Sequence, residues 1–89
     1  MEKIKLDNVD YEKLKSLDNF EVVEPNLYAN IEYSKTFKIY YVTIIFKNNE
    51  EICHAVPAFY YGKDYALTEL ITCLKRERSN YERRLYEYD

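Results

Sequence analysis

The segment between residues 36 and 46, TFKIYYVTIIF, carries a β-branched or aromatic side chain at almost every position. Such side chains favour extended backbone, so the segment predicts a β-strand. Successive side chains of a strand point to opposite faces, and both faces of this one are apolar or aromatic. A small domain can cover one face of a sheet with its own helices. The second face is then either covered by the N-terminal helix, in a closed α/β/α sandwich, or exposed as a surface for a partner or a second copy of the chain.

Two further strand patterns flank this segment. Residues 27–33 alternate apolar and polar side chains, and Pro25 limits their extension toward the N-terminus. Residues 50–56 follow Asn48 and Asn49, which tolerate the positive φ angles of a two-residue turn. The sequence therefore predicts a three-stranded antiparallel meander.

Helical patterns lie on both sides of the meander. Residues 9–18 predict a short helix capped by Asp7 or Asp10, and a brief extended segment can precede it. Residues 64–88 predict a long helix that Asp64 caps, because their apolar side chains recur at helical spacing. These side chains are Leu67, Leu70, Ile71, Leu74, Tyr81, Leu85 and Tyr88. The predicted fold class is α+β with the order α-β-β-β-α: a short N-terminal helix, the meander and a long C-terminal helix.

Two-residue turns at Ser34-Lys35 and Asn48-Asn49 would fix which side chains share a face. The first face is almost wholly apolar and is predicted to form the core under the helices. Its members are Leu27, Ala29, Ile31, Tyr33, Tyr40, Val42, Ile44, Phe46, Cys53, Ala55 and Phe59. The second face mixes aromatic and polar groups, as recognition surfaces do. Its members are Tyr28, Asn30, Glu32, Phe37, Ile39, Tyr41, Thr43, Ile45, Ile52, His54, Val56 and Tyr60.

Length and charge narrow the class of protein. Eighty-nine residues predict a single domain, residues 1–89. The net charge of −3 disfavours generic binding to nucleic acid or anionic membranes. The chain has no apolar run of membrane-spanning length and no apolar signal core near its N-terminus, which predicts a cytoplasmic protein without membrane contact. Its two cysteines are too few for a disulfide framework and are expected to be reduced.

The long helix carries two further features. Twenty-five helical residues span about 37 Å, whereas a domain of this size is roughly 30 Å across, so the helix is expected to overhang its sheet. Tyr81, Leu85 and Tyr88 would continue the apolar stripe into the overhang. The basic residues between 75 and 84 are interpreted as a solvated helix face, a phosphate contact or a contact with acidic groups of a partner.

No arrangement of residues indicates catalysis or a cofactor. His54 is the single histidine, and Cys53 beside it points to the opposite face of a strand. Nothing in the sequence places a third group beside His54 and Cys73, and two cysteines with one histidine fit no usual zinc spacing. Gly62 is the only glycine, so a Gly-rich phosphate loop is absent. The sequence predicts a protein that is not an enzyme and has no catalytic residues, metal or cofactor.

The order α-β-β-β-α resembles that of the double-stranded-RNA-binding domain. That family holds phosphates with a lysine cluster at the start of its last helix. Here the helix begins Asp64-Tyr65-Ala66-Leu67 without such a cluster. The resemblance therefore implies a topology and not RNA binding.

The overall composition resembles that of accessory proteins from phages and mobile elements of low-GC bacteria. The chain is small, acidic and rich in Tyr, Asn, Lys and Glu. Anti-CRISPR proteins and other inhibitors of host enzymes belong to this group. The resemblance implies a stoichiometric inhibitor in the cytoplasm of a bacterial host, with a host or phage protein as its partner.

The principal hypothesis is a non-enzymatic protein-binding module. Tyrosine and arginine dominate binding hot spots, so aromatic residues of the sheet face and residues of the helix tail are the candidate partner contacts. They are Tyr28, Phe37, Tyr41, Arg76, Tyr81, Arg83, Arg84 and Tyr88. One alternative is a nucleic-acid-binding domain that stacks bases on the sheet aromatics and contacts phosphates through the basic helix. Another is a homodimer built through the long helix or the sheet face.

Overall fold

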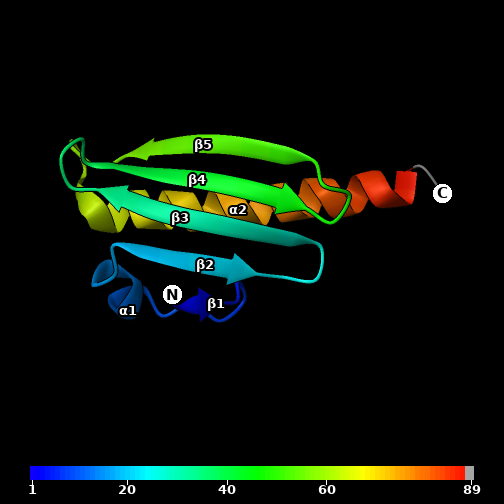
Figure 1. Cartoon of the computed structure of the whole chain (residues 1–89), viewed down its shortest axis with the longest axis horizontal. Coiled ribbons are helices and arrows are strands. Elements are labelled where there is room, and N and C mark those ends of the chain that lie inside the picture. The colour runs from blue at the N-terminus through cyan, green and yellow to red at the C-terminus, as the bar shows by residue number, and fades with distance from the viewer. Residues whose placement is uncertain (88–89) are drawn as a thin grey trace.

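The computed structural model describes residues 1–87, which form an α+β fold with one five-stranded mixed sheet and two helices (Figure 1). The elements are β1 (Lys3–Ile4), α1 (Tyr11–Lys15), β2 (Asn19–Val23), β3 (Leu27–Ser34), β4 (Ile39–Phe46), β5 (Glu51–Pro57) and α2 (Gly62–Glu87). The strands lie side by side in chain order. β1 is parallel to β2, and the other neighbours are antiparallel. None of the described helices combines the length and the apolar character needed to cross a membrane.

The α+β class and the long C-terminal helix are confirmed, but the predicted three-stranded antiparallel meander is wrong. The sheet has two more strands, β1 and β2, and one of its pairings is parallel. Pro25 does not mark the boundary of the sheet. It lies in the turn between β2 and β3, where Glu24 N donates to Leu27 O at 3.0 Å and a missing N–H costs nothing. β1 is only two residues long, too short for a periodic pattern.

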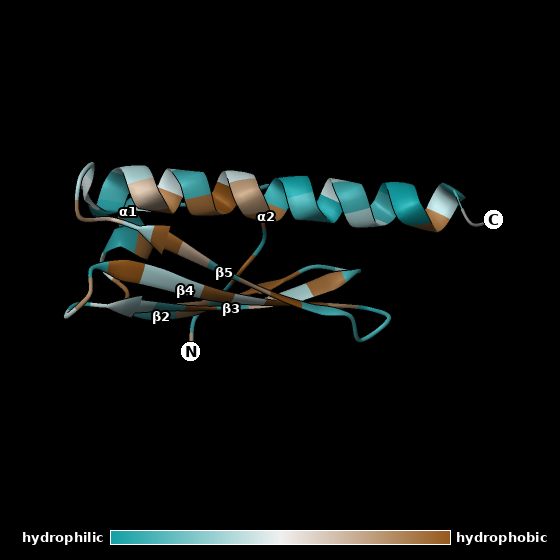
Figure 2. Cartoon of the chain, turned by 90° about the horizontal axis from the view of Figure 1, so that it is seen from above, coloured by the Kyte–Doolittle hydropathy of each residue, from teal (hydrophilic) through white to brown (hydrophobic). Residues whose placement is uncertain are grey.

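Both helices lie on the same face of the sheet (Figure 2). Asp10 caps α1, as one of the two predicted alternatives, by accepting a hydrogen bond from Lys13 N. α1 packs beside α2, so neither helix covers the other sheet face. The core between the two layers is wholly apolar apart from tyrosine hydroxyls. Its largest side chains are Phe20, Ile31, Tyr40, Ile44, Phe46, Leu14, Leu67, Leu70, Ile71 and Leu74.

The faces of β3 and β4 are as predicted, although the turn between them is longer than expected. Tyr33 pairs with Tyr40, and four residues, 35–38, connect the strands in place of two. The register shifts by an even number of positions, so every side chain keeps its face. Phe37 lies in this loop and is well exposed.

The predicted faces of β5 are wrong. Phe46 N donates to Glu50 O at 2.9 Å, so the turn between this pair has three residues, 47–49, in place of the predicted two. Asn49 adopts a φ of 70° in this turn. This odd shift turns the whole strand over. The side chains that face the helices are Ile52, His54 and Val56. Cys53 and Ala55 therefore lie on the uncovered face, and Phe59, also predicted to be in the core, is exposed after β5.

The far end of α2 overhangs the sheet, as predicted, but the overhang begins later (Figure 1). Tyr81 stacks on Phe46 with ring centroids 4.6 Å apart and is buried. It therefore belongs to the core and offers almost no surface to a partner. Leu85 and Tyr86 are exposed beyond it. Tyr88, predicted to continue this stripe and to contact a partner, lies outside the described residues.

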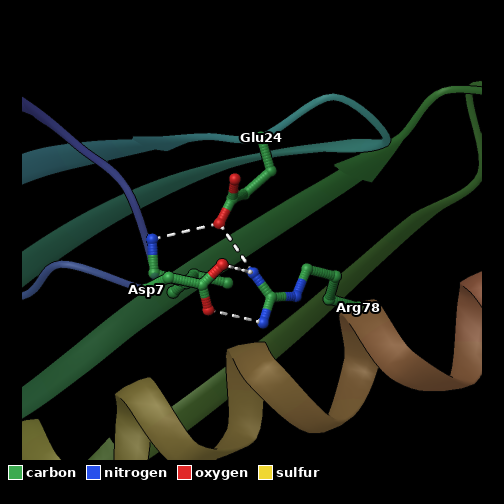
Figure 3. Close-up of polar contacts among 4 residues, drawn as sticks. Asp7, Glu24 and Arg78 are labelled. Carbon is green, nitrogen blue, oxygen red and sulfur yellow. Dashed lines mark hydrogen bonds and ion pairs between the residues drawn. The ribbon is translucent and has the colours of Figure 1, made fainter.

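An arginine on α2 ties the N-terminal part of the chain to the rest of the fold (Figure 3). Arg78 donates from Nη1 to Glu24 Oε1 at 2.9 Å and from Nη2 to Asp7 Oδ1 at 3.0 Å. The same Glu24 oxygen accepts a hydrogen bond from Leu6 N at 3.0 Å. Three segments far apart in the sequence thus meet at one guanidinium, which fixes the β1 side of the sheet beneath α2.

Candidate functional site: an aromatic groove beside an edge strand

A groove of about 500 Å³ runs between β5 and the first half of α2. It lies on the β5 side of α2, at the edge of the sheet opposite β1 (Figure 1). β5 contributes the wall from His54 to Pro57. The connecting loop and α2 supply the rest of the lining: Phe59, Tyr60, Tyr61, Tyr65, Glu69, Thr72, Cys73 and Arg76.

The α2 side of the groove is one continuous helix face. Tyr65, Glu69, Thr72, Cys73 and Arg76 follow each other at intervals of three or four residues, apart from the adjacent pair 72–73. This face lies beside the stripe that packs on the sheet. It therefore forms the wall of the groove opposite β5.

The β5 side of the groove is an open sheet edge. β5 pairs only with β4, so half of its backbone N–H and C=O groups have no strand to bind. The bonds Phe46 N to Glu50 O and Ala58 N to Lys38 O fix the alternation of the ladder. By that alternation, Glu51, Cys53 and Ala55 direct their backbone groups outward.

Exposed aromatic side chains surround one end of the groove. Tyr60 and Tyr61 are 84% and 77% exposed, and Phe59 and Tyr65 are about half exposed. The rings pair in contact, Phe59 with Tyr60 at 4.8 Å and Tyr61 with Tyr65 at 5.0 Å between centroids. Phe37 lies at the same end of the sheet, since its neighbour Lys38 accepts the backbone bond from Ala58. We call Phe59, Tyr60, Tyr61 and Tyr65 the aromatic mouth.

Three groups that can ligate a metal meet at the groove. The ligand atoms of His54, Cys73 and Glu77 all lie within 4.8 Å of one another. Burial raises the pKa of the Cys73 thiol, the charge of Arg76 lowers it to a smaller extent, and the charge of Glu77 raises it further. Sequence reasoning placed no third group beside His54 because the predicted register of β5 turned His54 away from the helices. One sign of this cluster was present in the sequence: Cys73 and Glu77 are one helical turn apart and therefore lie on the same side of the helix.

Of the predicted sheet-face contacts, Tyr28 and Tyr41 lie on the uncovered face, away from the groove, whereas Phe37 lies in the loop between β3 and β4 and not in a strand. Tyr41 is 46% exposed, whereas Tyr28 is half-buried, and burial followed by the Glu21 carboxylate raises the pKa of the Tyr28 hydroxyl. Around them the face carries Glu21, Glu32 and other polar side chains. The structure therefore does not bring these tyrosines together with the aromatic mouth.

Two arginines of the basic run between residues 75 and 84, Arg78 and the predicted contact Arg84, form ion pairs with carboxylates of the same chain. Arg78 is paired with Asp7 and Glu24, and hydrogen bonding by Asp7 raises the pKa of its guanidinium. Arg84 pairs with Glu50 at 3.3 Å and lies over the ring of Tyr81.

The remaining two predicted arginines point to different surroundings. Arg83 donates to Asn80 at 3.2 Å on the exposed helix tail, whereas Arg76 lines the groove. The structure therefore does not assemble the basic run into one phosphate-binding surface.

Comparison with known proteins finds no matching protein family, no matching curated protein and no matching solved structure. Any functional conclusion therefore depends on the groove, the edge strand and the chemistry beside them.

Proposed function

We propose that this chain is a non-enzymatic binding module that captures an extended segment of a partner protein. The segment would add to the sheet as a sixth strand beside β5, and its side chains on the helix side would fill the groove. The observation that carries the proposal is the coincidence of an open sheet edge with an unpartnered face of α2. An added strand would cover both at once.

Backbone pairing would supply the general part of the affinity. β5 is seven residues long and offers outward N–H and C=O groups at Glu51, Cys53 and Ala55. Pro57 has no N–H to offer, so pairing would end there. Alternate side chains of the captured segment would point into the groove. Its lining favours apolar or aromatic residues at those alternate positions, with a polar group near Arg76 and Glu69.

The aromatic mouth would supply the anchors. Tyrosines dominate binding hot spots because they bury a large area with few rotatable bonds. Tyr60 and Tyr61 have most of their surface free for such contacts. A one-to-one complex of this kind would make the chain a stoichiometric inhibitor or adaptor, the role that its resemblance to phage accessory proteins implies.

A peptide selection tests this function directly. A library of random displayed peptides is selected on the chain, and the enriched peptides are synthesised and titrated. We expect alternating apolar and polar residues in the enriched sequences. In the complex, hydrogen exchange at the outward amides of Glu51, Cys53 and Ala55 should slow, because they become bonded to the added strand.

Two variants separate the groove from other surfaces. Ala55→Pro removes one outward N–H without removing a bond to β4, and Tyr65→Ala removes one ring of the mouth. Each should weaken peptide binding by about tenfold or more, the loss of about 1.4 kcal/mol expected for an important contact. Tyr86→Ala, an exposed tyrosine on the helix overhang, is the matched control and should bind like the parent chain.

Two results would overturn the proposal. One is that the peptide slows hydrogen exchange in other strands of the sheet while the outward amides of β5 exchange as fast as in the free chain. The other is a stable dimer of the free chain that already protects the outward amides of β5, since a second copy would then occupy the edge.

A further inference from the structure

Three side chains of different chemistry converge from two elements. His54 projects from β5 toward the helix layer, and Cys73 and Glu77 lie one turn apart on α2. Their ligand atoms lie within 4.8 Å of one another, and His54 Nε2 is 3.9 Å from Glu77 Oε1. That separation is too long for a hydrogen bond, so the pair is close without being bonded.

The imidazole of His54 provides a second, independent sign of a missing ligand. Its Nε2 atom has less than 1 Å² of accessible surface and no hydrogen-bond partner among the described residues, although 36% of the side chain is exposed. Buried polar atoms nearly always have a partner, because leaving one unpaired costs about 1–3 kcal/mol. An ion between His54, Cys73 and Glu77 would satisfy this nitrogen.

The donor set selects the kind of ion. Imidazole, thiolate and carboxylate are the three ligand classes of zinc in proteins. Magnesium and calcium prefer oxygen ligands and are disfavoured by a thiol and an imidazole. Zinc bonds of about 2.0–2.3 Å would place neighbouring ligand atoms of a tetrahedral site roughly 3.5 Å apart. The present separations, of up to 4.8 Å, would need to shorten by about 1.3 Å at most, a movement of the size that side-chain rotations produce.

We propose that His54, Cys73 and Glu77 bind one zinc ion per chain. Three protein ligands leave the fourth tetrahedral position to water or to a donor from a bound molecule. That position opens toward the groove, since His54 and Cys73 both line it. The ion would bridge β5 and α2, two elements that otherwise meet through apolar contacts. This inference does not depend on strand capture, because the site is complete in the free chain.

The probe is Co²⁺, which occupies zinc sites and reports a cysteine ligand through its thiolate-to-cobalt charge-transfer absorption. The reduced, chelator-treated chain is titrated with Co²⁺, and Zn²⁺ is then added to displace it. We expect one Co²⁺ per chain with this absorption, its loss on adding Zn²⁺, and a shift of the His54 Nε2 resonance in the zinc-bound chain.

The two cysteines provide a matched pair of variants. Losing a group that merely supports a ligand lowers metal affinity about 10–100-fold, so Cys73→Ser, which loses the ligand itself, should lower Zn²⁺ affinity at least about 100-fold. Cys53→Ser should bind like the parent chain, because Cys53 lies on the uncovered sheet face. Glu77→Gln should also weaken binding, whereas Glu82→Gln, five residues farther along α2, should not.

Three outcomes would overturn the proposal. Zinc affinity that is equal in Cys73→Ser and in the parent chain would exclude the thiolate. Absorption that is lost in Cys53→Ser would place the metal elsewhere. A His54 resonance that does not move when zinc binds to the parent chain would exclude the imidazole, and this measurement does not depend on any variant folding.

Discussion

β1 and β5 are the two edge strands of one sheet. They differ in length, in what lies beside them and in the ion pairs around them. β1 has two residues, and ion pairs surround it: Lys13 with Glu2 at 2.6 Å, and Arg78 with Asp7 and Glu24. β5 has seven residues, and a groove runs along one side of it, with the aromatic mouth at its end. Long exposed edges invite unwanted pairing, and proteins commonly block them. This chain has ion pairs around one edge and leaves the other open, as the proposed capture of a strand beside β5 requires.

The largest effect is expected from breaking the ion pairs at the β1 edge. Arg78→Ala leaves Glu24, whose side chain is only 7% exposed, without a cation, and Asp7 loses both of its bonds. Breaking a buried pair costs 3–5 kcal/mol, and partial exposure of Arg78 reduces this to about 2–3 kcal/mol. Urea unfolding measures the loss. Arg83→Ala, on the exposed helix tail, should change stability by less than about 0.5 kcal/mol. Equal effects of the two variants would show that the ion pairs do not hold the edge.

The next effect tests the alternation of bonded and free backbone groups along β5. His54→Pro removes an N–H that points to Val42 on β4 and leaves a carbonyl unpaired, so it should cost about 1–3 kcal/mol. Ala55→Pro removes an N–H that points to solvent and should cost less than about 1 kcal/mol. Thermal unfolding of the metal-free variants makes the comparison. The reverse ranking would mean that β5 has the register predicted from the sequence, one residue out of step.

This register explains why part of the fold could be predicted from the sequence and part could not. The faces of β3 and β4 survived an error of two residues in their turn, because side chains alternate with a period of two. β5 was inverted by a single additional loop residue at Asn49, whose positive φ is compatible with turns of either length. The α2 stripe was predictable because it repeats over many turns. β1 has only two residues, and the segments that follow β1 and β2 meet at Arg78, which is far away in the sequence.

The candidate site was less predictable than the fold for the same reason. The groove depends on how β5 and α2 lie against each other, and no local sequence pattern encodes that placement. Tyr60, Tyr61 and Tyr65 lie in or beside a loop, where aromatic residues have no period to reveal their direction. His54 approaches Cys73 and Glu77 only in the observed register. The sequence thus predicts an aromatic surface, while the place where exposed aromatic side chains gather, at Phe59, Tyr60, Tyr61 and Tyr65, required the three-dimensional arrangement.

A smaller effect on stability is expected at low pH. Hydrogen bonds and charge from Arg78 lower the pKa of the Asp7 carboxyl below its ordinary value of 3.8. The folded-state pKa is thus below that of the unfolded chain, so the pairing stabilises the fold above pH 3.8. That contribution is lost as the pH falls further, through the folded-state pKa. Asp7→Asn should therefore be less stable than the parent chain at neutral pH, and the gap should close in acid. A gap in the urea midpoint that persists throughout would assign the effect to packing.

The smallest effect is expected on the uncovered face of the sheet, and it decides whether the groove alone binds. Tyr41 lies between Glu32 and Ala55 in its cross-strand row, so its ring has little apolar surface to join. Tyr41→Ala should cost about 1 kcal/mol of stability at most, the usual range of strand propensities on an exposed face. It should leave the affinity of a groove-binding peptide unchanged, whereas Tyr65→Ala weakens it. Titration of one peptide against both variants measures this. Weaker binding by Tyr41→Ala alone would move the site to the uncovered face, where the sequence first placed it.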